Sequence, residues 1–171
     1  MPRRLVLVLV VVVAVAWLGF RAVRAFDQDR HTAEAAAVLA APDKVTHDLP
    51  PVPTFSRPDF GPSGRFAYRP GTWLSVVDLQ GLDPAAGGGR YLVFLRNWAG
   101  WTLAGAVRPR PDGTAQVRSG AEPRPPTVYE VVVTWGVDDA TSVPHGQPVL
   151  HWFDGSLGPR RAVPFDFARG A

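Results

Sequence analysis

Two histidines near the carboxyl end of the chain have the residue type and acidic neighbours of a metal site. His145 and His151 lie six positions apart. The nearby carboxylates are Asp138, Asp139 and Asp154. Two imidazoles and a carboxylate can ligate zinc. However, His145 stands between a proline and a glycine in an expected loop, whereas His151 falls in an expected strand, and the spacing matches no metal motif. We therefore expect ordinary surface or boundary histidines and no bound metal.

Other reactive residue types occur without the partners that their chemistry needs. Asp138 and Asp139 could serve acid–base or calcium roles, but no second acidic cluster accompanies them. Ser156, in DGSLG, lacks the G-x-S-x-G pattern and a following helix. The glycine-rich stretch 85–90, AAGGGR, lacks the Gly-Lys-Ser/Thr ending of a phosphate-binding loop. The sequence therefore predicts no catalytic residue and no cofactor, and a protein that is not an enzyme.

The aromatic turn NWAGW, residues 97–101, is the best candidate for ligand or partner contact. Unless Trp98 and Trp101 both turn inward to cap the domain, one of them is exposed. An exposed tryptophan beside arginine and asparagine could stack on a sugar ring or anchor a partner protein. The expected contact residues are Arg96, Asn97, Trp98 and Trp101. The tryptophans that fall in expected strands and are assigned to the core are Trp73, Trp135 and Trp152.

Basic residues surround the RPDGT segment, residues 110–114. They are Arg108, Arg110, Arg118 and Arg124. Such a group could meet an anionic envelope polymer or lipid headgroups. Because Asp112 and Glu122 dilute the positive charge, we expect a solvated edge instead.

Composition excludes several classes of protein. The chain of 171 residues has no cysteine, so it can hold neither a disulfide nor a thiolate zinc site. The net charge is +3, and from residue 63 onward eleven arginines face nine acidic residues. A nucleic-acid-binding domain normally carries a clear basic excess. We therefore expect no nucleic-acid partner.

The amino-terminal segment is typical of a membrane anchor. Residues 5–20 contain no charged or polar side chain, and as a helix they would span about 24 Å. Snorkelling by Arg21 and Arg24 would extend this toward the roughly 30 Å of a hydrocarbon core. The anchor residues include Leu5, Val10, Val15, Trp17 and Phe20. We expect an uncleaved single-pass anchor in the cell membrane, contacting lipid, with the carboxy-terminal domain outside the cytoplasm. The alternative is a signal peptide cleaved near residues 14–16, which would give a secreted protein.

Three regions are expected: an anchor over 1–26, a juxtamembrane helix and proline-rich linker over 27–62, and a β-domain over 63–171. Residues 27–41 are rich in alanine with acidic residues in the first turn, which favours a helix. Residues 49–62 hold five prolines, which favour an extended, semi-rigid spacer.

The β-domain is indicated by short runs of β-branched and aromatic residues, separated by turn residues. The expected strands are 65–69, 72–79, 90–97, 101–107, 114–118, 127–135, 148–153 and 162–167. Asp112-Gly113 predicts a tight turn within 110–114, with Gly113 at positive φ. Alternation in 90–97 puts Tyr91, Val93 and Leu95 on one face. In 127–135 the face with Glu130 is expected to be the wetter one. This pattern predicts an all-β, immunoglobulin-like antiparallel sandwich of seven or eight strands.

A rhythm of motifs in this region resembles a known family. The stretch GLDPAAGGGRYLVFLRN (81–97) is followed by Gly105, Asp112-Gly113, the VVVT of 131–134 and a Pro-x-Gly-x-Pro-Val-Leu at 144–150. Over roughly residues 72–151 this looks like the carboxy-terminal extracytoplasmic domain of anti-sigma-K-type factors. Only Met1 to Arg4 precede the apolar span, so the resemblance supplies no sigma-binding surface and no functional residues. It implies an outer module that works alone or with a separate partner chain.

Taken together, the residues favour a non-enzymatic interaction, sensing or structural module on the membrane, with a protein partner in the envelope. One alternative is a carbohydrate- or lipid-binding envelope module that uses the exposed Trp and Arg residues. A further alternative is an envelope enzyme with an unrecognised site.

Overall fold

The computed structural model describes residues 32–53, 61–84, 88–120, 123–137, 141–158 and 163–166. The predicted membrane anchor, Leu5, Val10, Val15, Trp17 and Phe20 included, lies outside these ranges. Within them, no helix has the length and apolar character needed to cross a membrane. The chain divides into two units between Ala37 and Val38. Residues 32–40 are helical, which confirms that part of the helix predicted over 27–41.

The second unit contains eight strands rich in β-branched and aromatic residues, which suit a pleated surface. They are β1 (Val45–Leu49), β2 (Ser63–Tyr68), β3 (Ser75–Gln80), β4 (Arg90–Asn97), β5 (Gly100–Val107), β6 (Ala115–Ser119), β7 (Glu130–Gly136) and β8 (Gln147–Phe153). A short 3₁₀ helix, η1 (Pro125–Thr127), leads into β7.

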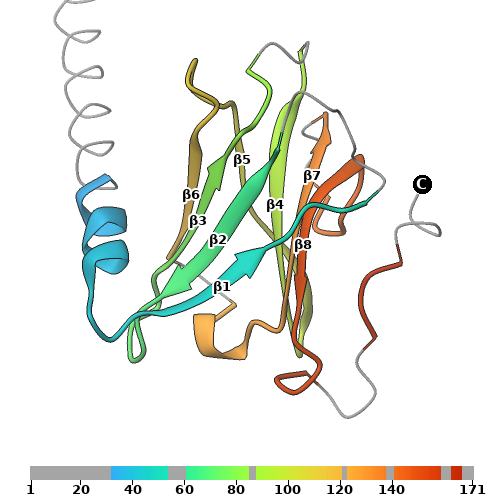
Figure 1. Cartoon of the computed structure of the whole chain (residues 1–171). Helices are drawn as coiled ribbons and strands as arrows, with labels where there is room; N and C mark the ends of the chain where they lie inside the picture. The colour runs from blue at the N-terminus through green and yellow to red at the C-terminus, as the bar shows by residue number, and fades with distance from the viewer. Residues whose placement is uncertain are drawn as a thin grey trace, which may run out of the picture. The chain divides into compact units, whose positions relative to one another are not determined.

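The strands form two antiparallel four-stranded sheets (Figure 1). The first sheet has the order β1-β2-β3-β6 and the second has the order β5-β4-β7-β8. The prediction of an all-β antiparallel fold with two packed sheets is therefore confirmed. The immunoglobulin-like form of this sandwich stays a prediction.

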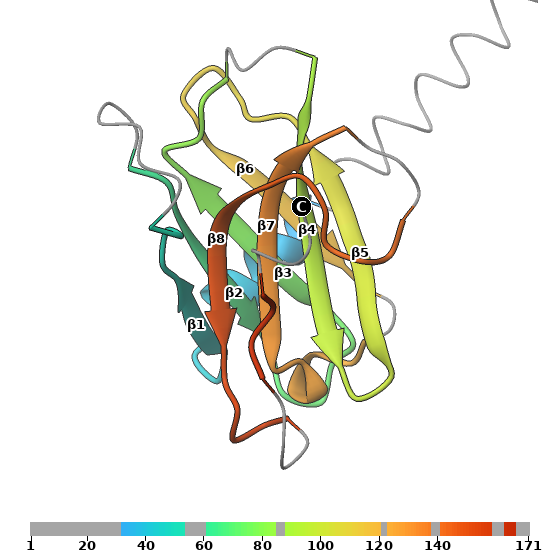
Figure 2. The same ribbon diagram turned by 90° about the vertical axis from the view of Figure 1, so that its right-hand side faces the viewer.

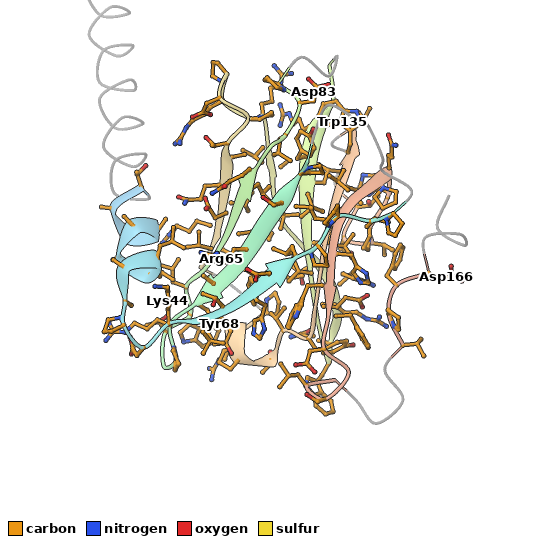
Figure 3. All side chains as sticks on the ribbon, in the orientation of Figure 1. Lys44, Arg65, Tyr68, Asp83, Trp135 and Asp166 are labelled. Carbon is orange, nitrogen blue, oxygen red and sulfur yellow. The ribbon has the colours of Figure 1, made fainter. Side chains whose placement is uncertain are left out.

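The main core lies between the two sheets. From the first sheet it receives Phe66, Val77 and Leu79, and from the second it receives Val93 and Val131, all buried. Tyr91, Val93 and Leu95 point into it together, as the alternation in 90–97 predicts. Figure 3 shows side chains filling this layer, with Tyr68 and Trp135 near its opposite ends. Both also pack against this core, Trp135 only partly buried.

The amino-terminal edge of the sandwich differs from the prediction. Residues 45–49, placed in the helix-and-linker region, form β1 and pair with β2. Residues 50–52 then run along the edge strand β8: Pro51 pairs with Leu150, Val52 N–H donates to the Val149 carbonyl, and His151 N–H donates to the Pro50 carbonyl. The domain boundary at 63 and the start of the linker at 49 are therefore wrong. Prolines tolerate an edge position because it needs fewer amide donors, and the pairing shields β8 from other chains.

Strand ends also differ from the sequence pattern. Strand β3 begins at Ser75, which leaves Trp73 outside it and 43% exposed, so its assignment to the core is wrong. Strand β7 begins at Glu130 because η1 occupies part of the preceding proline-containing stretch. Residues 163–166 are not a strand. The turn in 110–114 is confirmed: Gly113 has a φ of 76°, and Asp112 accepts hydrogen bonds from both the amide and the hydroxyl of Thr114.

Candidate interaction surface

The predicted contact residues lie where β4 turns into β5, at one end of the second sheet. Asn97 pairs with Gly100, and the Asn97 Oδ1 accepts a hydrogen bond of 2.9 Å from the Ala99 amide. This side-chain-to-backbone bond is a usual device of asparagine in tight turns. It leaves Trp98 at the tip, 66% exposed. Of the two tryptophans in NWAGW, Trp98 is therefore the one presented to solvent.

Trp101 has a different environment, on the outer face of the second sheet. It is half-buried and packs with Leu103 and Ala106 against a buried cluster of Leu92, Phe94 and Val132. Its ring meets that of Phe165 edge to face, with centroids 5.5 Å apart. This geometry is favourable for two aromatic quadrupoles. The outer face of the second sheet is thus apolar at its centre, although one solvated face is common in antiparallel sheets.

Arg96 is held between the apolar cluster and a carboxylate. Its Nη1 donates to Glu130 Oε2 at 2.8 Å and to the Val163 carbonyl at 3.2 Å. The guanidinium carbon also lies over the rings of Trp101 and Tyr129, 5.3 and 5.6 Å from their centroids. Arginine suits this position because its planar group can stack and hydrogen-bond at once. The Arg96 side chain is consequently fixed in place rather than free in solvent.

Glu130 is the centre of this polar group and is fully buried. Besides Arg96, it is approached by His151 Nε2 at 2.8 Å and by the Phe165 amide, which donates at 2.5 Å. A buried carboxylate is tolerated only when charged and hydrogen-bonding partners replace water. The expectation that the Glu130 face of β7 is wetter is therefore wrong: Val132 and Thr134 on that face are buried as well.

His151 lies at the boundary between core and surface, one of the two environments predicted for it. It lies on β8, opposite Val132, and reaches diagonally to Glu130 within the same sheet face. Its side chain is only one-fifth exposed. We name the set Arg96, Glu130 and His151 the carboxylate cluster.

The other end of the same face is covered by residues 141–146, which lead into β8. His145, from this loop, places its ring edge-on to Phe94, with centroids 5.5 Å apart. The His145 ring nitrogens lie 2.8 Å from the Thr141 hydroxyl and 3.2 Å from the Val137 carbonyl. Figure 2 looks onto this sheet and shows the coloured part of this loop, residues 141–146, in front of it. His145 therefore holds the loop against the sheet, whereas His151 hydrogen-bonds within the carboxylate cluster.

The remaining sequence candidates are placed as follows. Ser156 donates its hydroxyl to Asp154 within a turn, which lowers the pKa of that carboxyl. Asp138 and Asp139 lie outside the described residues. Across the part of the chain that the structure describes, no group of three His, Cys, Asp or Glu side chains is arranged to hold a metal ion. Of the basic residues, Arg124 stacks on Trp73, with its guanidinium carbon 3.8 Å from the ring centroid.

A second aromatic group, inside the sandwich where β1 meets β8, was not anticipated. His47 lies 4.1 Å from Trp152 between ring centroids and 6.2 Å from Phe66. Burial lowers the pKa of His47, and the charge of Asp154 opposes this shift in part. The His47 Nε2 is buried and has no hydrogen-bond partner among the described residues. This group favours a neutral imidazole that packs as an aromatic ring.

The sequence thus predicted the hairpin but did not identify the residues grouped with it, which are Glu130, His151 and Phe165. The available signal was a single glutamate inside the apolar run VYEVVVTW. A charged residue in such a run is costly to bury unless it is paired. The comparisons with known proteins add no relative: no family model matches the chain, and neither a curated protein nor a solved structure shows significant similarity to it.

Proposed function

We propose that this chain is a non-enzymatic interaction module, tethered to the cell membrane by residues 5–20 and displayed outside the cytoplasm. It binds a protein partner in the envelope through the β4–β5 hairpin and the adjoining outer face of the second sheet. The observation that carries the proposal is the juxtaposition of an exposed Trp98 with the fixed carboxylate cluster. Tryptophan and arginine are the residue types most enriched where interfaces gain their binding energy.

The fixed geometry of Arg96 supports a binding role. A side chain that is already held loses little conformational freedom when a partner docks, so more of the contact energy appears as affinity. Glu130 and the rings of Trp101 and Tyr129 hold the guanidinium in this way. Trp98, in contrast, has most of its surface free for a partner.

The resemblance to the outer domain of anti-sigma-K-type factors supports the same placement. Its residues fall largely in turns and buried strands. Gly146, in the Pro-x-Gly-x-Pro-Val-Leu stretch, has a φ of 83° at the turn into β8, and Val149 and Leu150 are buried. Such residues specify a fold of this kind better than an activity. The proposal is therefore an outer module that signals or assembles through a separate chain.

The partner is tested by photo-crosslinking in native membranes. A benzoylphenylalanine replaces Trp98 in the full chain, and the matched control carries it at Gln80, an exposed residue at the end of β3 in the other sheet. We expect a discrete adduct from position 98 and none from position 80. The same pattern at both positions, or none at either, would refute binding through this surface.

The location is tested separately with thiol labelling. Because the chain has no cysteine, a single cysteine at the exposed Thr46 gives a clean signal. An impermeant maleimide should label this residue in intact cells. Labelling that requires lysis would overturn the placement outside the cytoplasm.

The alternative is a carbohydrate- or lipid-binding module, which the exposure of Trp98 also favours. A glycan or headgroup that stacks on Trp98 would change the tryptophan fluorescence, and Trp98→Ala would remove that change. If neither millimolar glycan nor anionic lipid vesicles change the tryptophan fluorescence, this alternative is refuted and the protein-partner proposal stands.

A further inference from the structure

Residues 163–166 lie on the outer face of the second sheet, and Figure 2 shows this segment in front of it. Two contacts fix its main chain to the carboxylate cluster. The Phe165 amide donates to Glu130 Oε1 at 2.5 Å, and the Val163 carbonyl accepts from Arg96 Nη1 at 3.2 Å. One partner is an acceptor and the other a donor, so together they hold the backbone of an extended chain. Neither contact depends on which side chains that chain carries.

One side-chain contact adds selectivity. The Phe165 ring packs edge-on against Trp101 and joins the apolar cluster of Leu92, Phe94 and Val132. An aromatic side chain at this position buries apolar surface of the cluster that a smaller side chain would leave exposed to solvent. The surface therefore fits an extended segment in which one residue supplies both an aromatic side chain and a backbone N–H that can donate a hydrogen bond.

The segment is itself largely exposed. Val163 is 67% exposed, and Pro164 and Asp166 are also exposed. Residues 163–166 are not part of the ladder of either sheet. Elements with few buried apolar contacts open at low free-energy cost. Glu130, by contrast, is fully buried and needs its partners.

We propose that the outer face of the second sheet is a binding site for an extended, aromatic-bearing segment of a partner protein, and that residues 163–166 occupy it as an intramolecular competitor. This inference rests on the proposed function, because it names the chemistry of the partner at the same surface. A short tether gives such a competitor an effective concentration on the order of millimolar. Residues 163–166 therefore occupy the site until a partner segment binds more tightly or the tail dissociates from the sheet.

The experiment uses a labelled peptide with the sequence of residues 161–168, RAVPFDFA, followed by fluorescence anisotropy. It is titrated with the full chain in detergent and with a chain that ends at Gly158. We expect saturable binding to the shortened chain, and binding at least about tenfold weaker to the full chain because of its tethered competitor. Two matched peptides separate the contacts: Phe165→Ala removes the ring, and N-methylation of Phe165 keeps the ring but removes the amide donor to Glu130. Each should weaken binding by about tenfold, a loss of roughly 1.4 kcal/mol.

The proposal is overturned if the shortened chain keeps its native circular dichroism and fails to bind the peptide, or if it binds the Phe165→Ala peptide equally well. Should the shortened chain unfold, the full chain carrying Phe165→Ala takes its place, since it retains the tail without the aromatic anchor. Peptide binding no stronger than that of the unmodified full chain would then refute competition. A crosslinked partner at position 98 together with a negative peptide result leaves the interaction module intact and removes the proposal about the extended segment and its competitor.

Discussion

Arg96 and Glu130 are directly opposite each other in the antiparallel ladder of β4 and β7, and their side chains meet on the outer face with Nη1 2.8 Å from Oε2. Opposite charges at facing positions stabilise a strand pair. Here the carboxylate is also buried, so the pair replaces the water that Glu130 loses on folding. The stability of the second sheet therefore depends on two residues of the proposed binding face.

Removing the carboxylate should therefore destabilise the fold. Glu130→Ala leaves the partly buried Arg96 and His151 without their common partner, and we expect a loss of about 3–5 kcal/mol in the free energy of unfolding. Glu130→Gln keeps the shape but loses the charge, and about 1–3 kcal/mol is expected. Chemical denaturation measures both.

The control carboxylate is Asp48, which pairs with Arg65 at 3.3 Å while both side chains are largely exposed. Asp48→Asn should change stability by less than about 1 kcal/mol. Equal losses from Asp48→Asn and Glu130→Gln would show that burial does not set the value of the Glu130 contacts.

Acid should destabilise the protein through His47. Burial lowers its pKa in the folded state, so the unfolded chain takes up a proton more readily, with a pKa of about 6.5. The contribution to stability is present above about pH 6.5 and is lost as the pH falls through the folded-state pKa. His47→Phe keeps an aromatic ring beside Trp152 but cannot titrate.

We expect the melting temperature of His47→Phe to fall less than that of the unmodified chain between pH 7 and pH 5. Melting curves in matched buffers provide the measurement. Parallel pH profiles for the two proteins would mean that His47 carries no folding-linked proton uptake.

Gly146 should not accept a side chain. Its φ is 83°, and a Cβ placed there would run into the backbone carbonyl of Trp135, which cannot move aside. Gly71 has a similar φ of 80° but open space around a Cβ. Both Gly→Ala changes incur backbone strain of about 1–2 kcal/mol, and Gly146→Ala should lose clearly more. Similar losses of stability at the two positions would mean that the positive φ explains the whole effect and that the clash with Trp135 contributes nothing.

The two tryptophans of NWAGW should respond differently to truncation. Trp98→Ala removes an exposed ring, and we expect a change in stability within about 0.5 kcal/mol. Trp101→Ala removes a half-buried ring that packs against Phe165, for which about 1–2 kcal/mol is expected. The reverse order in thermal or chemical unfolding would contradict the assignment of Trp98 to partner contact.

Local patterns in the sequence were enough to predict most strands of the sandwich. Residues 90–97 alternate apolar and mixed positions between a glycine run and an asparagine turn, and β4 has those bounds. The prediction failed where tertiary contacts outweighed local preference. The prolines at 50, 51 and 53 indicate a spacer, yet residues 50–52 pair with β8, and residues 45–49 before them pair with β2.

The candidate site was only partly predictable for a similar reason. The asparagine and glycine of NWAGW indicate a turn, and its tryptophans predict contact with a ligand or partner. Nothing in the neighbourhood of Glu130 along the chain identifies Arg96, His151 or Phe165 as its partners, because they lie 21 to 35 positions away in sequence.

The sequence by itself determined that this chain builds antiparallel strands, where most of them lie, and which side chains of 90–97 share a core, since these follow from side-chain size and two-residue alternation. Only the tertiary structure decided that the second face of the same sheet is also buried and carries a paired carboxylate. That outcome depends on strand order and on the position of residues 163–166, which are set by contacts between segments far apart in the chain.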